Sequence, residues 1–211
     1  NYFIINNHFK CCGDGIIDFD DTSDEENRRY TAINLIKEYI DNNLSDNNVI
    51  ILGDLNDNIA EDPPNNVFQN VLNDSTHYRF ADFEIAQGNS SEWSFPNWPD
   101  HLDHILITNE MFNGLNNFDV QTIKIDEYLD GGWNEYDQNI SDHRPVAIKY
   151  SINSAAYYDI NNDGIINDAD FIILLSFIMN DNGLTDSADI NFDSVIDIFD
   201  LLLLSDFIQN M

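Results

Sequence analysis

A short acidic segment occurs twice in the last third of the chain and leaves little freedom for how that part folds. The segment DINNDGIINDAD at 159–170 returns as DINFDSVIDIFD at 189–200 without gaps, and an apolar run of helical length follows each copy. Both copies carry side-chain oxygens at positions 1, 3, 5, 9 and 12, the ligand spacing of a Ca²⁺ loop of the EF-hand type. Ordinary solvated acidic turns are not expected to match twice. The tail is therefore predicted to fold around two calcium ions.

Each loop has its own predicted ligand set, in which the residue at position 7 contributes its backbone carbonyl oxygen. The expected ligands are Asp159, Asn161, Asp163, Ile165, Asn167 and Asp170 in the first loop, and Asp189, Asn191, Asp193, Val195, Asp197 and Asp200 in the second. Position 6, where the loop turns sharply, is Gly164 in the first loop and Ser194 in the second. Because serine carries a Cβ, the second loop is expected to bind Ca²⁺ somewhat less tightly.

Position 12 is aspartate in both loops, in place of the longer glutamate of the complete helix-loop-helix hand. A duplicated loop of this kind with one helix after each copy resembles the type I dockerin module, here over 157–211. The resemblance implies a small all-α domain that folds on Ca²⁺ and binds a cohesin module of a scaffold or cell-surface protein. It also implies a partner face formed by Asp168, Ala169, Ile198 and Phe199. Four leucines belong either to that face or to the module's own core, namely Leu174, Leu175, Leu203 and Leu204.

Charge divides the chain at the same place. The sequence has 39 acidic and 8 basic side chains and a formal charge of −31, and every basic residue lies before residue 150. We therefore predict a first domain over 1–152, a linker over 153–156 and the dockerin over 157–211. Such an acidic surface repels polyanions unless metal ions or a local basic patch intervene, which argues against a simple nucleic-acid-binding module. No apolar run reaches the roughly 18 to 20 residues of a membrane span.

The first domain has an α/β pattern. Its strand-like runs are YFIINNHF, NVIILGDL, LDHILIT and RPVAIKY. Between the first two, the segment 24–43 places Tyr30, Ile33, Ile36 and Ile40 at helical spacing behind three acidic residues, which favour a helix N-terminus. Loops rich in Asn, Asp and Pro occupy 58–100 and are expected to form the rim of a site.

Side chains suited to catalysis gather at the ends of the predicted strands. They occur in NNHFK (His8, Lys10), GDLND (Asp54, Asn56), HLDHILIT (His101, Asp103, His104) and ISDHRPV (Asp142, His143, Arg144). Hydrolysis of a phosphodiester needs an oriented water, a divalent ion that neutralises phosphoryl oxygens, and stabilisation of the leaving oxygen. Carboxylate and amide oxygens are suited to a hard cation. His104 is expected to point away from Asp103 on its strand and to be structural.

In this order, ending with SDHRPV on the last strand, the four segments resemble the endonuclease/exonuclease/phosphatase superfamily, and most of all its secreted bacterial nucleases. The resemblance covers 1–150 and implies a deoxyribonuclease-like α/β two-sheet sandwich with catalytic Mg²⁺ or Mn²⁺. It implies that His8, Asp54, Asn56, Asp103, Asp142 and His143 are catalytic, with Asp142 and Asp54 also serving the metal ion.

The same resemblance assigns individual roles. Asp54 would orient or deprotonate the attacking water, and Asn56 would hold a phosphate oxygen. His143 would contact the phosphate while Asp103 fixes its tautomer and charge. His8 would act as a second imidazole on the leaving-group side.

Substrate contacts are assigned to cationic and aromatic side chains near these segments, because cations bind phosphate and indole rings stack on bases. They are Lys10, Arg28, Trp93, Trp98, His101 and Arg144. For Arg28 and Arg29 on the predicted helix, the alternative is a surface or ion-pair role. For the aromatic residues of EWSFPNWPDH, the alternative is packing within the loop.

Two further features allow more than one interpretation. The segment GDGIIDFDDTSDEE at 13–26 holds many carboxylates without the spacing of the tail loops, so a solvated rim is favoured over a third Ca²⁺ site. Cys11 and Cys12 are adjacent and cannot join distant segments. They form either a strained vicinal disulfide or a pair of reduced thiols.

Members of the superfamily carry an Asn and a metal-binding Glu on strands that precede the His8 segment, whereas residue 1 here lies within a predicted strand. We therefore expect this chain to be the C-terminal portion of a longer enzyme, inactive or unstable alone. The leading hypothesis is a monomeric, extracellular or cell-surface-attached phosphodiesterase that acts on nucleic acid and binds cohesin. A second hypothesis keeps the fold but changes the substrate to a phospholipid or phosphomonoester. A third is a non-catalytic adhesion subunit that bears a dockerin.

Overall fold

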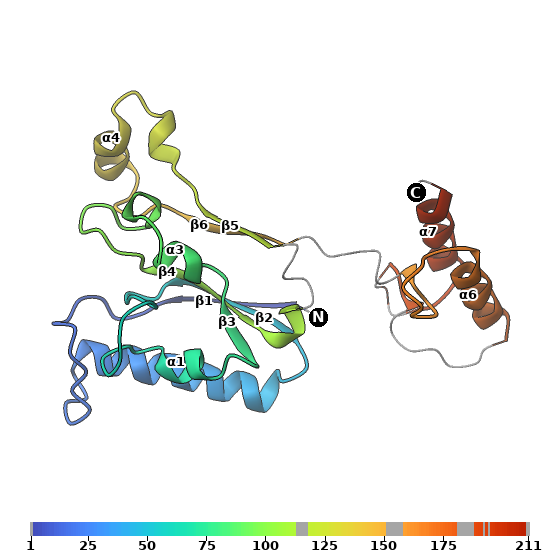
Figure 1. Cartoon of the computed structure of the whole chain (residues 1–211), viewed down its shortest axis with the longest axis horizontal. Coiled ribbons are helices and arrows are strands. Elements are labelled where there is room, and N and C mark those ends of the chain that lie inside the picture. The colour runs from blue at the N-terminus through green and yellow to red at the C-terminus, as the bar shows by residue number, and fades with distance from the viewer. Residues whose placement is uncertain are drawn as a thin grey trace. The chain divides into compact units, whose positions relative to one another are not determined.

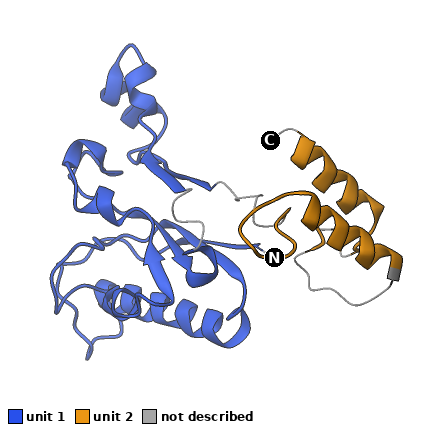
Figure 2. Ribbon diagram, turned by 45° about the vertical axis from the view of Figure 1, so that its right-hand side comes forward, with its two compact units in different colours: residues 1–151 blue, residues 152–211 orange. Residues whose placement is uncertain are grey.

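The computed structural model of the chain describes residues 2–112, 118–150, 158–180, 188–191, 193 and 195–209. The chain divides into two compact units, Asn1–Ser151 and Ile152–Met211 (Figure 2). Each unit has an apolar core of its own. The candidate catalytic residues lie in the first unit and the acidic loops lie in the second.

A four-stranded sheet forms the centre of the first unit (Figure 1). Its strands, in spatial order, are β1 (Tyr2–His8), β2 (Asn48–Asp54), β4 (Asp103–Thr108) and β3 (Tyr78–Phe80). β1 and β2 are parallel, and the other pairs are antiparallel. Parallel neighbours need a crossover connection, which α1 (Glu25–Asn43) provides. The carboxyl ends of β1 and β2 therefore lie at the same edge of the sheet.

α1 is the amphipathic helix that the sequence predicts at 24–43. Asp24 is the N-cap, and its side chain accepts a hydrogen bond from the backbone N–H of Asn27 at 2.7 Å. At the other end, the Leu44 N–H donates to the Ile40 carbonyl, which closes the last turn. Ile33 and Ile40 are almost fully buried in one core with residues of the sheet, so the helix covers one face of it (Figure 1).

A second, two-stranded sheet packs against the other face of β4. Its strands, β5 (Phe118–Thr122) and β6 (Val146–Tyr150), are antiparallel. Their apolar side chains share a core with Ile105 and Ile107, whereas Leu106 belongs to the core on the α1 side. Burial on both faces explains why three consecutive residues of β4, Ile105, Leu106 and Ile107, are all apolar. The first unit is therefore mixed α/β with two small sheets, and the finer deoxyribonuclease-like sandwich stays a prediction.

Short helices connect these strands. They are α2 (Gln69–Asn73), α3 (Phe83–Ala86) and α4 (Gly132–Asn139), with the 3-10 helices η1 (Ser90–Glu92) and η3 (Ile125–Tyr128). α2, α3 and η1 lie within the 58–100 region that the sequence marks as loops. No helix in the described part of the chain is long and apolar enough to cross a membrane.

The second unit is built on two helices, α6 (Asp168–Asn180) and α7 (Ile198–Gln209). Its described core consists of Ile160, Leu174, Ala188, Ile190, Leu201 and Leu204. Of the leucines with two possible roles, Leu174 and Leu204 are therefore core residues, and Leu175 packs partly against that core. Leu203 is 40% exposed and stays available to a partner.

Candidate functional site

Three strands place side chains of the candidate site in one row at an edge of the central sheet. His8 ends β1 and is in register with Asp54, which ends β2. Asp54 is in turn in register with Asp103, the first residue of β4. The loop that precedes β6 adds His143. All six residues expected to be catalytic, including Asn56 and Asp142, line a single cleft of about 1020 Å³.

The backbone at the end of β2 is shaped for this row. Gly53 has φ +128°, and a Cβ built there would lie 2.0 Å from the backbone oxygen of Asn7 on β1. Only glycine allows the two strands to approach so closely. Beyond it, Asn56 has φ +57°, and its N–H donates to Oδ1 of Asp54 at 3.0 Å. This bond fixes the orientation of the Asp54 carboxylate. The Asn56 side-chain amide also donates to the Phe9 carbonyl at 3.3 Å.

The Asp54 carboxylate lies between two imidazoles. Its Oδ2 is 3.5 Å from Nε2 of His8 and 3.9 Å from Nε2 of His143. On its other side, the His143 ring places Nδ1 2.7 Å from Oδ2 of Asp103. The ring of Phe95 packs on the His143 ring at 4.8 Å between centroids. Asp103 and Phe95 therefore hold His143 with Nε2 directed at the cleft.

These contacts shift the pKa values of His143 and Asp54. The hydrogen bond to Asp103 raises the pKa of His143, and this effect outweighs partial burial of the ring. Burial raises the pKa of Asp54, and the like charge of Asp103 raises it further, while the two imidazoles act in the opposite direction. A carboxylate with a raised pKa next to an imidazole with a raised pKa is an arrangement suited to proton transfer.

The same cluster fits a divalent cation. Donor atoms of Asp54, Asp103 and His143 lie within 4.8 Å of one another. A cation between the two carboxylates would relieve the repulsion that raises the pKa of Asp54. Carboxylate oxygens are the ligands that Mg²⁺ prefers. Asp142, which is exposed next to His143, lines the same cleft.

A second group of carboxylates lines the cleft beside this cluster and consists of Asp57, Glu61 and Asp100. Burial raises the pKa of each of them, and for Glu61 burial together with the charges of Asp57 and Asp100 raises it to about 7. Arg29 offsets part of this charge, because its Nε donates to Oδ2 of Asp57 at 2.8 Å. Arg29 is 3% exposed, which agrees with the ion-pair alternative for this residue.

Most side chains expected to bind substrate do not line the cleft. Lys10 and Arg28 are exposed outside it. Trp93 donates from Nε1 to the Ile85 carbonyl at 3.0 Å, and Arg144 donates from Nε and Nη2 to Asp126 at 2.9 and 2.6 Å. Trp93 therefore agrees with the loop-packing alternative, and the expected substrate contact of Arg144 is corrected, because its guanidinium is bound by Asp126. Only Trp98, 78% exposed, is at the cleft.

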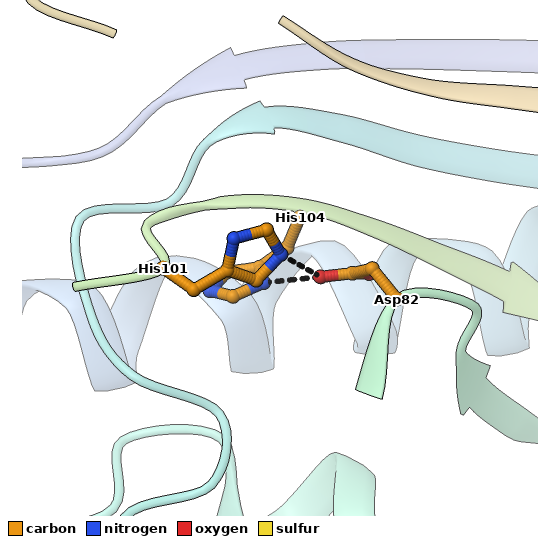
Figure 3. Close-up of side chains that lie close together, drawn as sticks. All are labelled: Asp82, His101 and His104. Carbon is orange, nitrogen blue, oxygen red and sulfur yellow. Dashed lines mark hydrogen bonds and ion pairs between the residues drawn. The ribbon is translucent and has the colours of Figure 1, made fainter. Parts of the chain in front are cut away.

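His101 is also corrected, because it is fully buried and does not face the cleft. Figure 3 shows its ring and that of His104 converging on the carboxylate of Asp82. The Ser94 N–H donates to Nδ1 of His101, so Nε2 carries the proton and donates to Oδ2 of Asp82 at 3.1 Å. His101 is therefore a neutral structural histidine.

His104 is structural as predicted, and it is an imidazolium. Nε2 lies 2.8 Å from the Asp57 carbonyl, which can only accept, and Nδ1 lies 2.6 Å from Oδ2 of Asp82. Burial opposes this charge, but the Asp82 carboxylate prevails and raises the pKa of His104. For Asp82, burial is likewise outweighed by His104 and by hydrogen bonds from both histidines, which hold its pKa well below the usual range. This buried ion pair fixes the loop that follows Asp54.

The sequence does not single out Asp82, Glu61 or Asp100. Asp82 lies in the segment FADFEI, and no spacing connects it with the two histidines of HLDH. Their contact depends on the pairing of β3 with β4, which a three-residue strand does not reveal in sequence. Glu61 and Asp100 lie in the loop segments EDP and PDH, and no regular spacing connects them with each other or with Asp57. Phe95 lies in an aromatic loop that the sequence does mark.

The thiols of Cys11 and Cys12 lie at the cleft as well. Their sulfurs are 2.8 Å apart and not bonded, so the structure has the reduced pair.

In the second unit, the two acidic loops have the same internal hydrogen bonds. Asp170 accepts from the N–H groups of Asn161 and Asn167 at 3.1 and 2.9 Å. Asp200 accepts from Asn191 and Asp197 at 3.1 and 2.8 Å. Position 12 thus closes each loop on itself, in keeping with a repeated ion-binding turn.

The remaining predicted ligands, which include Asp159, Asp163, Asp193, Ile165 and Val195, lie on exposed or half-buried parts of these loops. Gly164 has φ +84°, as the sharp turn requires, whereas Ser194 lies outside the described residues. Among the expected partner contacts, Ile198 and Phe199 are 51% and 60% exposed, and Asp168 is exposed beside half-buried Ala169.

Comparison with known proteins identifies the second unit. Residues 157–209 match the model of the dockerin type I domain family, and this part of the chain is a type I dockerin. No curated protein matches the chain. One solved structure, titled the crystal structure of a functionally unknown conserved protein from Enterococcus faecalis V583, aligns at 16% identity with a TM-score of 0.41. The alignment covers 70% of this chain and 49% of that one, so the chain spans about half the length of that protein.

Proposed function

We propose that this chain, whose residues 157–209 form a type I dockerin, is a metal-dependent phosphodiesterase attached to a cohesin-bearing scaffold or cell surface. The dockerin suggests the attachment, the Ca²⁺ dependence and an extracellular or cell-surface location. The catalytic assignment concerns the first unit. Its main support is the position of Asp54 between His8 and His143, with Asp103 behind His143.

The residues divide the work of ester hydrolysis among themselves. Asp54, oriented by the Asn56 N–H, would accept the proton of the attacking water. His143, whose pKa the hydrogen bond to Asp103 raises, would donate from Nε2 to a phosphoryl oxygen. His8, 73% exposed on the far side of Asp54, would protonate the leaving oxygen. A divalent ion held by Asp54 and Asp142, with Asp103 nearby, would neutralise the phosphoryl charge.

Nucleic acid is the proposed substrate, on the strength of the resemblance of HFK, GDLND, LDH and SDHRPV to secreted nucleases. Trp98 at the cleft offers an exposed ring on which a base can stack. The competing phospholipid or phosphomonoester substrate uses the same reacting groups. Incubation of the full-length protein with plasmid DNA, RNA and sphingomyelin in Mg²⁺ distinguishes these substrates by which one is cleaved.

A second candidate function, a non-catalytic dockerin-bearing subunit, is favoured by the charge of the cleft. Among the residues that line it, Arg29 is the one arginine or lysine, and its donors are bound to Asp57, Glu26 and two backbone carbonyls. An anionic substrate therefore finds no free lysine or arginine along the described lining. Under this alternative, the histidines and carboxylates of the row have structural roles only.

Substitutions in the row decide between the two functions. In the full-length protein with Mg²⁺, Asp54→Asn and His143→Ala are expected to lower phosphodiester cleavage by about 100-fold or more, because each removes a proton-transfer group. Asp46→Asn and His77→Ala, which replace exposed residues outside the cleft, are the matched controls and should retain wild-type rates. Equal rates for all four variants, or no metal-stimulated cleavage by the full-length wild-type protein, would support the non-catalytic subunit.

A further inference from the structure

Three carboxylates gather where the loop between β1 and α1 meets the first turn of α1, and the proposed catalysis does not use them, although Glu26 also lines the cleft. Donor oxygens of Asp14, Asp24 and Glu26 lie within 4.8 Å of one another. Asp14 is exposed, Asp24 is half-buried and Glu26 is 2% exposed. The fold thus gathers side chains that the sequence spacing alone assigned to a solvated rim.

Glu26 carries an unsatisfied atom in this cluster. Its Oε1 accepts from the Gly15 N–H at 2.7 Å and lies 3.2 Å from Nη2 of Arg29. Its Oε2 is buried and has no hydrogen-bond partner among the described residues. A buried carboxylate oxygen without a partner is costly, and native structures rarely leave one unsatisfied. The carboxylate is also enclosed by the loop, since a Cβ at Gly13 would lie 2.4 Å from Oε2.

The neighbouring arginine does not neutralise the cluster. Arg29 donates from Nε to Asp57 and from Nη1 to the carbonyls of Lys10 and Cys12. Within the cluster, Arg29 contacts only Glu26, through Nη2. It therefore does not compensate the charges of Asp14 and Asp24. The positive end of α1 amounts to about half an elementary charge and offsets only part of them.

We propose that Asp14, Asp24 and Glu26 bind a divalent cation, and that this cation is Ca²⁺. Carboxylate oxygens on an irregular loop suit Ca²⁺, which accepts flexible geometry and completes its shell with carbonyls and water. The unpartnered Oε2 of Glu26 would be the inner ligand, and the two more exposed aspartates would close the site from the solvent side. Each aspartate uses Oδ1 for a local turn, to the N–H of Ile16 and of Asn27 respectively.

The site has a consequence for the cleft. Cys11, Cys12, Gly13 and Gly15 line the cleft, and the cation would tie this part of the loop to the first turn of α1. Binding of Ca²⁺ in the first unit therefore orders one wall of the candidate active site, independently of the dockerin loops.

Amide hydrogen exchange of the full chain tests this site, because it reports on 13–24 separately from the dockerin. In the wild type, excess Ca²⁺ is expected to slow exchange in that segment relative to chelator by about tenfold or more. The variant Asp14→Asn/Asp24→Asn should lose this difference and bind one Ca²⁺ fewer by equilibrium dialysis. Asparagine keeps both turns and the N-cap, so the fold is retained.

A matched control removes the same charge elsewhere. Asp20→Asn/Asp46→Asn replaces two exposed aspartates of the first unit outside the cluster and should behave as the wild type. The proposal is overturned if the amide exchange rates of residues 13–24 in the wild type are the same in chelator and in excess Ca²⁺. It is equally overturned if the Asp14→Asn/Asp24→Asn variant retains both the protection and the full Ca²⁺ count.

Discussion

At the scale of single residues, the protein uses histidine in two distinct ways. His143 keeps Nε2 toward the cleft because Asp103 occupies Nδ1. His104 has both ring nitrogens occupied by acceptors and lies in the core, where its charge is matched by Asp82. Each of these histidines directly follows an aspartate in the sequence, His104 in HLDH and His143 in SDH. His143 is partly exposed and can contact a substrate, whereas His104 is buried and cannot.

The buried pair of Asp82 and His104 leads to a prediction on stability. Asp82→Asn leaves an uncompensated imidazolium in the core and should lower the free energy of unfolding by about 3–5 kcal/mol at pH 6. The raised pKa of His104 means that its contribution is complete below its unfolded value, about 6.5, and is lost as pH rises through the folded value. The lowered pKa of Asp82 means that its contribution to stability is complete above about pH 3.8, its unfolded pKa. This contribution is lost only as the pH falls through the lower pKa of the folded state.

Denaturant unfolding at several pH values measures this effect. The free energies of unfolding of the wild type and of Asp82→Asn should differ most between about pH 3.8 and pH 6.5, where both the Asp82 and the His104 contributions are present. The difference should become smaller in alkali, where His104 is neutral. Asp46→Asn serves as the exposed control and should change stability little at any pH. A difference that stays constant up to strongly alkaline pH would contradict the ion pair.

At the scale of elements, the close approach of β1 and β2 depends on one glycine. Gly53→Ala should cost more than about 2 kcal/mol, because the added Cβ meets the Asn7 backbone and φ is +128°. Gly132→Ala is the matched control, since Gly132 also has positive φ, +58°, but nothing lies within 4 Å of its Cβ position. Its cost should be about 1 kcal/mol. Thermal or chemical unfolding of the two variants provides the comparison, and equal costs would show that the close contact is unimportant.

The elements also show what the sequence can and cannot predict. α1 and the strands β1, β2, β4 and β6 have clear periodicity or apolar runs, and they are found within about two residues of the predicted ends. β3 has three residues and β5 reads FDVQT, so neither carries a pattern long enough to identify.

The residues of the candidate site also fall into those that the sequence can place and those that it cannot. His8, Asp54, Asp103 and His143 lie at the ends of recognisable elements, and their proximity follows once those elements pair. His101 and Trp93 could not be placed from sequence, because their orientation depends on Asp82 and on the Ile85 carbonyl, which other segments supply. Tertiary contacts of this kind leave no periodic signal.

At the scale of the whole molecule, the two units differ in what holds them together. The first unit has a core of buried apolar side chains between α1 and the sheet. The second has a small core of described residues and two loops rich in carboxylates, where like charges repel until a cation binds. Below about 70–80 residues, such domains commonly depend on metal ions or disulfides.

Removal of Ca²⁺ should therefore act on the second unit first. With a chelator, we expect loss of helical circular dichroism from α6 and α7, while the first unit keeps a separate unfolding transition. Asp170→Asn should weaken the Ca²⁺-induced gain in helicity, because Asp170 closes its loop from position 12. Asp168→Asn, two residues away and exposed, is the control and should keep that gain. Helicity that is the same in chelator and in excess Ca²⁺ would exclude a metal-dependent fold.

The positions of His8, Asp54 and Asp103 relative to one another depend on the register in which the strands pair. If β4 slipped by one residue along β2, His104 would arrive beside Asp54, and Asp103 would turn into the apolar layer against α1. A lone carboxylate in that layer is too costly for the slipped sheet to persist. Native pairing of β2 with β4 therefore places Asp54 and Asp103 side by side as soon as the sheet forms. A molecule with the slipped pairing is too unstable to accumulate.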